Sequence, residues 1–64
     1  MELTKRQIKI LKLLAQGKKP KEIAQKINFS QGTVRAELDA MFRVTNSNGQ
    51  SMLLLWAYKN GYLS

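Results

Sequence analysis

The sequence lacks the side chains on which most hydrolytic enzymes depend. Its 64 residues include no cysteine, no histidine and only four Asp and Glu, so the usual metal sites and nucleophile–base pairs cannot be built. Without cysteine, no disulfide can stabilise a chain that is near the lower size limit for a domain with its own core. We therefore expect a compact domain that is not an enzyme and that binds no cofactor or metal.

Long apolar runs and strand patterns are also missing. Lysines interrupt the apolar pattern of the N-terminal segment, MELTKRQIKILKLLAQG, which separates it from a signal peptide or a membrane span. The chain has no strand-like alternation, no internal repeat and no linker. These absences predict a soluble, cytoplasmic, all-α protein in which residues 1–64 form a single domain.

Negative charge is scarce. Eleven Lys and Arg against four Asp and Glu give a formal net charge of +7, and a field of this sign attracts polyanions such as nucleic acid. The alternative is that the charge serves only solubility, as it does in many small domains. The motifs in the chain decide in favour of nucleic acid.

The first predicted helix covers Lys5–Gln16, after Thr4 and before a helix-ending Gly17. Its residues divide into an apolar side and a polar side, as in an amphipathic helix. The apolar side is predicted to be Ile8, Ile10, Leu11, Leu14 and Ala15. The polar side, which we expect to be solvated, is Lys5, Lys9, Lys12 and Gln16.

The central stretch, Lys21–Val44, is predicted to form two helices at a tight turn. Pro20 fits the first turn of the shorter helix, whose apolar pattern stops at Asn28-Phe29. Ser30 supplies an N-cap hydroxyl for the longer helix. The buried stripe of that helix is predicted to be Val34, Leu38, Met41 and Phe42. This arrangement is typical of a helix-turn-helix, and double-stranded DNA is the first predicted partner.

A fourth helix is predicted over Gln50–Lys59, after the turn formers Asn46–Gly49, with Asn48 or a neighbour as its cap and Asn60-Gly61 at its end. It is apolar around most of its circumference. One stripe, expected to pack on the first and third helices, is Leu53, Leu54, Ala57 and Tyr58. The other, expected to lack a partner in the chain and to form a homodimer interface, is Met52, Leu55, Trp56 and Lys59. The alternative is that Trp56 folds back under Tyr62 and Leu63.

Together these features make the chain resemble the LuxR-type (GerE-type) helix-turn-helix domain of bacterial transcription regulators. The residues that match the family pattern in register are Leu3-Thr4, Arg6, Leu11, Leu13–Gly17, Lys21–Ala24, Ile27, Ser30, Thr33-Val34, Leu38 and Phe42-Arg43. There are departures from that pattern. Gln7 stands where the family usually has Glu, and Glu37 where it often has His. Thr45 and Ser47 replace two residues that are usually apolar, and Gly49 replaces a polar one.

The resemblance implies four helices, of which the third enters the major groove and the fourth mediates dimerisation. By the same resemblance, the base-facing residues would be Arg35, Ala36 and Asp39. Those near phosphates would be Lys21, Thr33 and Arg43.

The residues themselves support part of this assignment. Arg35 leaves the buried stripe, and its guanidinium suits guanine or a phosphate. Lys19 and its neighbours surround the start of the second helix, which crosses the DNA backbone in this motif, and so are placed for phosphate contacts. Thr33 has the alternative of being an ordinary first-turn helix residue.

The sequence therefore predicts a sequence-specific, dimeric transcriptional regulator, cytoplasmic in a bacterium and nucleoid-associated when bound to DNA. The alternative is a protein-interaction module of the same fold, which uses the apolar fourth helix to bind and modulate another regulator or RNA polymerase. Glu37 and Asp39 motivate this alternative, because carboxylates on a reading helix repel phosphates.

Overall fold

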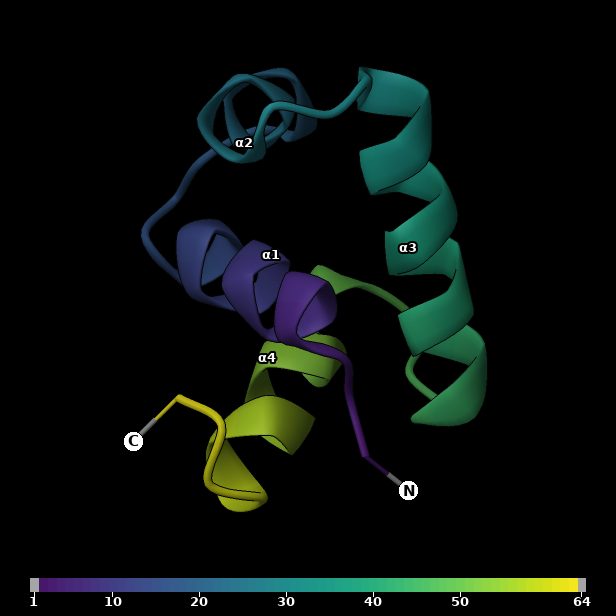
Figure 1. Ribbon diagram of the computed structural model, residues 1–64. Helices are drawn as coiled ribbons and strands as arrows, with labels where there is room; N and C mark the ends of the chain where they lie inside the picture. The colour runs from purple at the N-terminus through teal and green to yellow at the C-terminus, as the bar shows by residue number, and fades with distance from the viewer. Residues whose placement is uncertain (1, 64) are drawn as a thin grey trace.

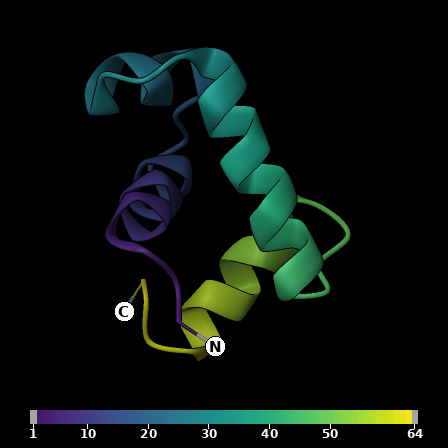
Figure 2. The same cartoon turned by 45° about the vertical axis from the view of Figure 1, so that its right-hand side comes forward.

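The computed structural model describes residues 2–63, and four helices account for most of them (Figures 1 and 2). The helices are α1 (Lys5–Ala15), α2 (Pro20–Ile27), α3 (Gln31–Val44) and α4 (Gln50–Lys59). No strand occurs within the described range. The predicted all-α, four-helix class is confirmed, and every helix begins and ends within one residue of its predicted position.

The core lies around α1, which contacts each of the other three helices, while α2 also packs on α3. Fully buried side chains come from every helix. The largest are Ile10, Leu11, Ile23, Val34, Met41 and Leu53. Because α1 is in the middle, it supports both the α2–α3 pair and α4 (Figure 1).

Local capping explains where α1 begins and ends. The Thr4 hydroxyl accepts a hydrogen bond from the Gln7 N–H at 3.1 Å, and the Gln7 side-chain oxygen accepts one from the Thr4 N–H at 3.0 Å. Gly17 ends the helix with φ of 87°. One expectation for this helix was wrong, because Ala15 is exposed. It lies roughly 100° around the helix from the centre of the buried residues.

The turn between α2 and α3 has the predicted form. Asn28 adopts the left-handed conformation, with φ of 62°, which asparagine tolerates better than most residues. The Phe29 N–H then donates to the Ala24 carbonyl at 3.0 Å. Ser30 caps α3, since its hydroxyl accepts from the Thr33 N–H at 3.1 Å.

The connection from α3 to α4 is closed by polar groups. The Thr45 hydroxyl donates to the Met41 carbonyl at 2.7 Å and also lies 2.7 Å from the Ser47 hydroxyl. Two residues that depart from the expected family pattern thus bond to the end of α3 and to each other. Asn48 is not the cap of α4: Gly49 occupies that position, and no side chain within residues 2–63 accepts a hydrogen bond there.

The faces of α4 differ in part from the predicted stripes. Leu53 and Ala57 are buried and Leu54 is half-buried, but Tyr58 is 64% exposed instead of packed. Trp56 has a partner in the chain, because its ring stacks on Tyr62 with centroids 5.5 Å apart. The alternative for Trp56, that it folds back on the C-terminal residues, is the correct one.

Helix geometry accounts for both corrections. Trp56 lies about 80° around α4 from the centre of the Leu53–Ala57 stripe, whereas Tyr58 lies about 120° away. The chain also reverses after Gly61, whose φ is 84°, so that the Tyr62 N–H donates to the Ala57 carbonyl at 2.9 Å. This reversal brings Tyr62 over the indole.

Candidate nucleic-acid interface

The outward face of α3 carries the residues predicted to contact DNA. Val34, Leu38 and Met41 are buried against the rest of the domain. The exposed α3 residues include Arg35, Ala36, Asp39 and Arg43. Because the buried residues recur every three or four positions, the exposed ones share the opposite side of the helix.

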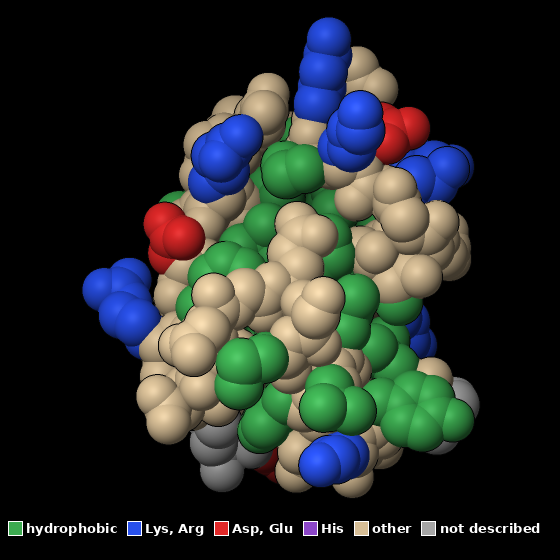
Figure 3. Space-filling view, turned by 180° about the vertical axis from the view of Figure 1, so that it is seen from behind, with side chains coloured by type: hydrophobic (Ala, Val, Ile, Leu, Met, Phe, Trp, Pro, Cys, Tyr) green, Lys and Arg blue, Asp and Glu red, His purple; other side chains and the backbone are tan. Residues whose placement is uncertain are grey.

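The start of α2 borders this face. Pro20 lines a shallow hollow of about 180 Å³ together with Arg35 and Asp39, and the remaining lining residues are Leu38, Phe42 and Gln50. Lys19 and Lys21, which flank Pro20, are both exposed. The predicted phosphate-contacting lysines of α2 and the predicted base-facing residues of α3 are thus brought to one surface. Figure 3 shows Lys and Arg side chains around the upper part of the molecule, over α2 and the start of α3.

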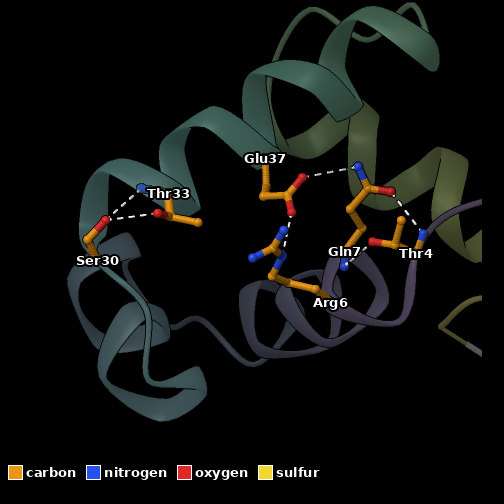
Figure 4. A network of polar contacts seen from close by, with 6 residues as sticks. All are labelled: Thr4, Arg6, Gln7, Ser30, Thr33 and Glu37. Carbon is orange, nitrogen blue, oxygen red and sulfur yellow. Dashed lines mark hydrogen bonds and ion pairs between the residues drawn. The ribbon is translucent and has the colours of Figure 1, made fainter.

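Glu37 lies on a different side of α3 from the residues predicted to face bases. Its carboxylate pairs with the Arg6 guanidinium, with Nε and Oε2 2.6 Å apart, and accepts a hydrogen bond from Gln7 Nε2 at 3.3 Å (Figure 4). Its side chain is only 17% exposed. The expectation that this carboxylate would face phosphates was wrong. Of the two acidic residues that motivated the alternative function, only Asp39 is exposed on the outward face.

Arg6 connects α1 to α3 and to the turn of the helix-turn-helix. Besides its ion pair with Glu37 on α3, its guanidinium lies over the Phe29 ring in the α2–α3 turn, 4.6 Å from the centroid. Sequence reasoning missed this role. The signal was present in Gln7 and Glu37, two of the departures from the family pattern: they contact one another across 30 positions of sequence, and Glu37 also pairs with Arg6.

Thr33 is half-buried at the start of α3. Its hydroxyl lies 2.9 Å from the Ser30 hydroxyl, and its N–H is bonded to the same group (Figure 4). This arrangement matches an ordinary first-turn residue next to an N-cap. A threonine hydroxyl has more than one hydrogen-bonding capacity, so a phosphate contact stays a prediction.

The predicted dimer residues on α4 are not equivalent. Met52 and Leu55 are 47% and 55% exposed, and Lys59 is also exposed, whereas Trp56 is half-buried under its stack with Tyr62. Hydrophobic side chains gather over the lower part of the molecule, where α4 lies (Figure 3). The exposed apolar surface of α4 therefore consists of Met52, Leu55 and Tyr58.

The structure has the three parts of a helix-turn-helix domain. They are a short helix, a turn through a left-handed asparagine, and a longer capped helix on which Arg35 and Asp39 face outward. The chain belongs to the luxR family of bacterial regulatory proteins, whose family pattern matches residues 1–57.

Two known proteins are similar to it. YhjB of Escherichia coli (strain K12), a candidate HTH-type transcriptional regulator, is 42% identical over 55 residues, which cover 81% of this chain and 28% of YhjB. The chain thus spans just over a quarter of that relative's length. The solved structure of the transcription factor GerE superimposes with a TM-score of 0.94 at 29% identity, over 97% of this chain and 92% of GerE.

The helices were also compared with the length and composition of membrane-spanning segments. Within residues 2–63, none of the helices combines the length and the apolar character that crossing a bilayer requires.

Proposed function

We propose that the chain is the DNA-binding domain of a sequence-specific transcriptional regulator, that α3 enters the major groove, and that two copies associate through α4. The observation that carries this proposal is the single surface made by the start of α2 and the outward face of α3, where Lys19, Lys21, Arg35 and Asp39 are all exposed. The transcription factor GerE has the same fold, and YhjB is a candidate regulator by name.

Affinity for duplex DNA should come mainly from cations near phosphates, because each one releases condensed counterions when it binds. The exposed residues at the edges of the surface suit this role. They are Lys19 and Lys21 at the start of α2 and Arg43 near the end of α3. Thr33 would add a hydroxyl contact at the first turn of the docked helix.

Sequence preference would come from Arg35, Ala36 and Asp39. Arg35 suits the O6 and N7 acceptors of guanine, whereas a carboxylate accepts from the amino group of cytosine. The Ala36 side chain can make apolar contact with a thymine methyl group. Asp39 thus weakens non-specific binding and contributes to discrimination between base sequences, because every phosphate repels its carboxylate and only particular bases donate a hydrogen bond to it.

The dimer would form around a two-fold axis through the exposed side of α4, so that the two α3 helices meet half-sites about one DNA turn apart. Met52, Leu55 and Lys59 lie on this side. Trp56, whose ring is stacked on Tyr62, would offer only the part of the ring that this stack leaves uncovered. Tyr58 is exposed beside them and would enlarge the interface.

A second candidate function is a protein-interaction module of the same fold that acts on another regulator or on RNA polymerase. The observation that favours it is the combination of an outward carboxylate, Asp39, with the exposed apolar side of α4. This candidate predicts weak or absent duplex binding.

Selection from a random duplex library, followed by affinity measurement on the enriched site, tests the two candidates. We expect an enriched sequence and a loss of affinity for it in Arg35→Ala. The matched control is Lys9→Ala, which also removes one exposed positive charge but from α1, and it should retain affinity for the site. A library that yields no enriched sequence would favour the protein-interaction module.

A further inference from the structure

A second hollow of the surface lies away from the proposed DNA-binding face. It has a volume of about 550 Å³ and is formed by one side of α1, the end of α2 and the turn before α3. Its lining residues are Lys5, Arg6, Ile8, Lys9, Lys12, Ile27 and Phe29.

Apolar side chains form the floor of the hollow. Ile8 and Ile27 are half-buried, and Phe29 is 47% exposed although it is held in place under the Arg6 guanidinium. Covering these three side chains removes apolar surface from water, which is favourable only if the covering groups are themselves apolar. The floor therefore selects for apolar side chains of a partner.

Unpaired positive charge forms the rim. Lys5, Lys9 and Lys12 recur along α1 at the spacing of one helix face, with Ile8 between them. Each lies beyond ion-pair distance of every carboxylate in residues 2–63, whereas the charge of Arg6 is already matched by Glu37. The rim therefore selects for negative charge at intervals of three to four residues along a partner helix.

We propose that this groove binds an acidic amphipathic helix of a partner protein, with apolar side chains over Ile8, Ile27 and Phe29 and with carboxylates beside Lys5, Lys9 and Lys12. An apolar helix face laid in a groove is a common mode of peptide recognition. A duplex matches only half of this surface, because its phosphates satisfy the lysines and leave the apolar floor uncovered.

The groove and the proposed DNA-binding face are separate. Arg6, which lines the groove, is paired with Glu37, and Glu37 lies about 160° around α3 from Asp39. A partner helix in the groove leaves Arg35 and Asp39 exposed. We therefore expect a partner helix in the groove to leave the base-facing side of α3 accessible.

The probe is a synthetic helical peptide of about 15 residues, long enough for some helicity in isolation, with leucines on one face and glutamates on both flanks. Fluorescence anisotropy measures its affinity, and amide chemical shifts of the ¹⁵N-labelled protein locate its site. We expect binding, with shifts in α1, at Ile27 and at Phe29. A peptide whose leucines are replaced by serine should not bind.

Two double variants with the same net charge provide the decisive comparison. Lys5→Glu/Lys9→Glu reverses charge on the rim, and Lys18→Glu/Lys26→Glu reverses it outside the groove and outside the proposed dimer interface. We expect the first to weaken peptide binding about tenfold and the second no more than about twofold.

Three results would overturn the proposal: no binding of the peptide to wild type, equal weakening by both double variants, or shifts confined to α3 and the start of α2. Displacement of the peptide from the groove by a single-stranded oligonucleotide, with the same residues shifting, would assign the groove to nucleic acid instead. Because the peptide titration contains no duplex, a failure of the proposed DNA binding leaves this test unaffected.

Discussion

Two carboxylates on α3, Glu37 and Asp39, are only two residues apart, yet the structure predicts opposite consequences for their neutralisation. Glu37→Gln and Asp39→Asn remove the same charge with almost no change in shape. Glu37 is paired with Arg6 and Gln7 of α1, whereas Asp39 is exposed on the proposed DNA-binding face. We expect the first substitution to reduce stability and the second to raise non-specific affinity for DNA.

The magnitudes follow from burial and distance. The Arg6 side chain is 43% exposed and that of Glu37 17% exposed, so their charge-assisted pair is partly screened and its loss should cost about 0.5–1.5 kcal/mol. For a domain of this size each kcal/mol lowers the Tm by about 4–8 °C. If a phosphate approaches Asp39 to about 8 Å through water, removing the carboxylate charge should strengthen duplex binding by on the order of 0.5–1 kcal/mol, or about two- to fivefold in affinity.

Thermal unfolding followed by circular dichroism and anisotropy titration of a random duplex measure the two effects on the same samples. Asp39→Asn should unfold within about 0.5 kcal/mol of wild type, as exposed substitutions usually do. Glu37→Gln should raise duplex affinity only slightly, because the negative charge that it removes lies away from the DNA-binding face. If Glu37→Gln instead left the Tm unchanged and raised duplex affinity as much as Asp39→Asn, then Glu37 would face the DNA and the orientation of α3 described above would be wrong.

Four further outcomes are expected. Duplex affinity should fall steeply with salt concentration in anisotropy titrations, and affinity that is independent of salt would contradict DNA as the partner. Lys21→Ala or Arg43→Ala should weaken binding to all sequences about equally, and each should reduce the slope of log affinity against log salt concentration by about 1. Arg35→Ala should reduce the binding free energy for a specific site by about 1–3 kcal/mol and that for random duplex by little, as gel shifts on the two duplexes would measure. Leu55→Glu should leave the helical circular dichroism intact and abolish the dimer in sedimentation experiments, and a wild type that stays monomeric at high concentration would refute the proposed interface. Leu53→Ala, at a fully buried position, should cost about 2–5 kcal/mol in denaturant unfolding, and a loss below about 1 kcal/mol would show that α4 is not part of the core.

The helices could be predicted because their signals are local. Ser30 and Thr33 lie within one turn of each other and decide where α3 begins, and Gly17 ends α1 through its own backbone conformation. The buried stripe of Val34, Leu38 and Met41 follows from helical periodicity alone. The register of the whole chain with the family pattern then placed the second and third helices as a helix-turn-helix.

The burial of individual side chains was harder to predict at the borders of a buried stripe. Periodicity treats Trp56 and Tyr58 as equally apolar residues near the buried side of α4, but only one of them has a partner. The partner is Tyr62, which reaches Trp56 because the chain reverses at Gly61. Trp56 and Tyr58 lie on opposite sides of the buried stripe, Trp56 about 40° nearer to its centre, and the reversal at Gly61 covers only the side on which Trp56 lies.

The sequence by itself thus determined the four helices, their caps and turns, and the family to which the chain belongs, because these depend on residues within a few positions of each other and on overall register. Only the tertiary structure decided which way Glu37 points. Its partners, Arg6 and Gln7, are about 30 residues away on another helix, and their proximity arises from the packing of α1 against α3. The same packing makes α1 the support of the helix-turn-helix and leaves its lysine face beside an apolar groove, a combination that no local pattern in the chain contains.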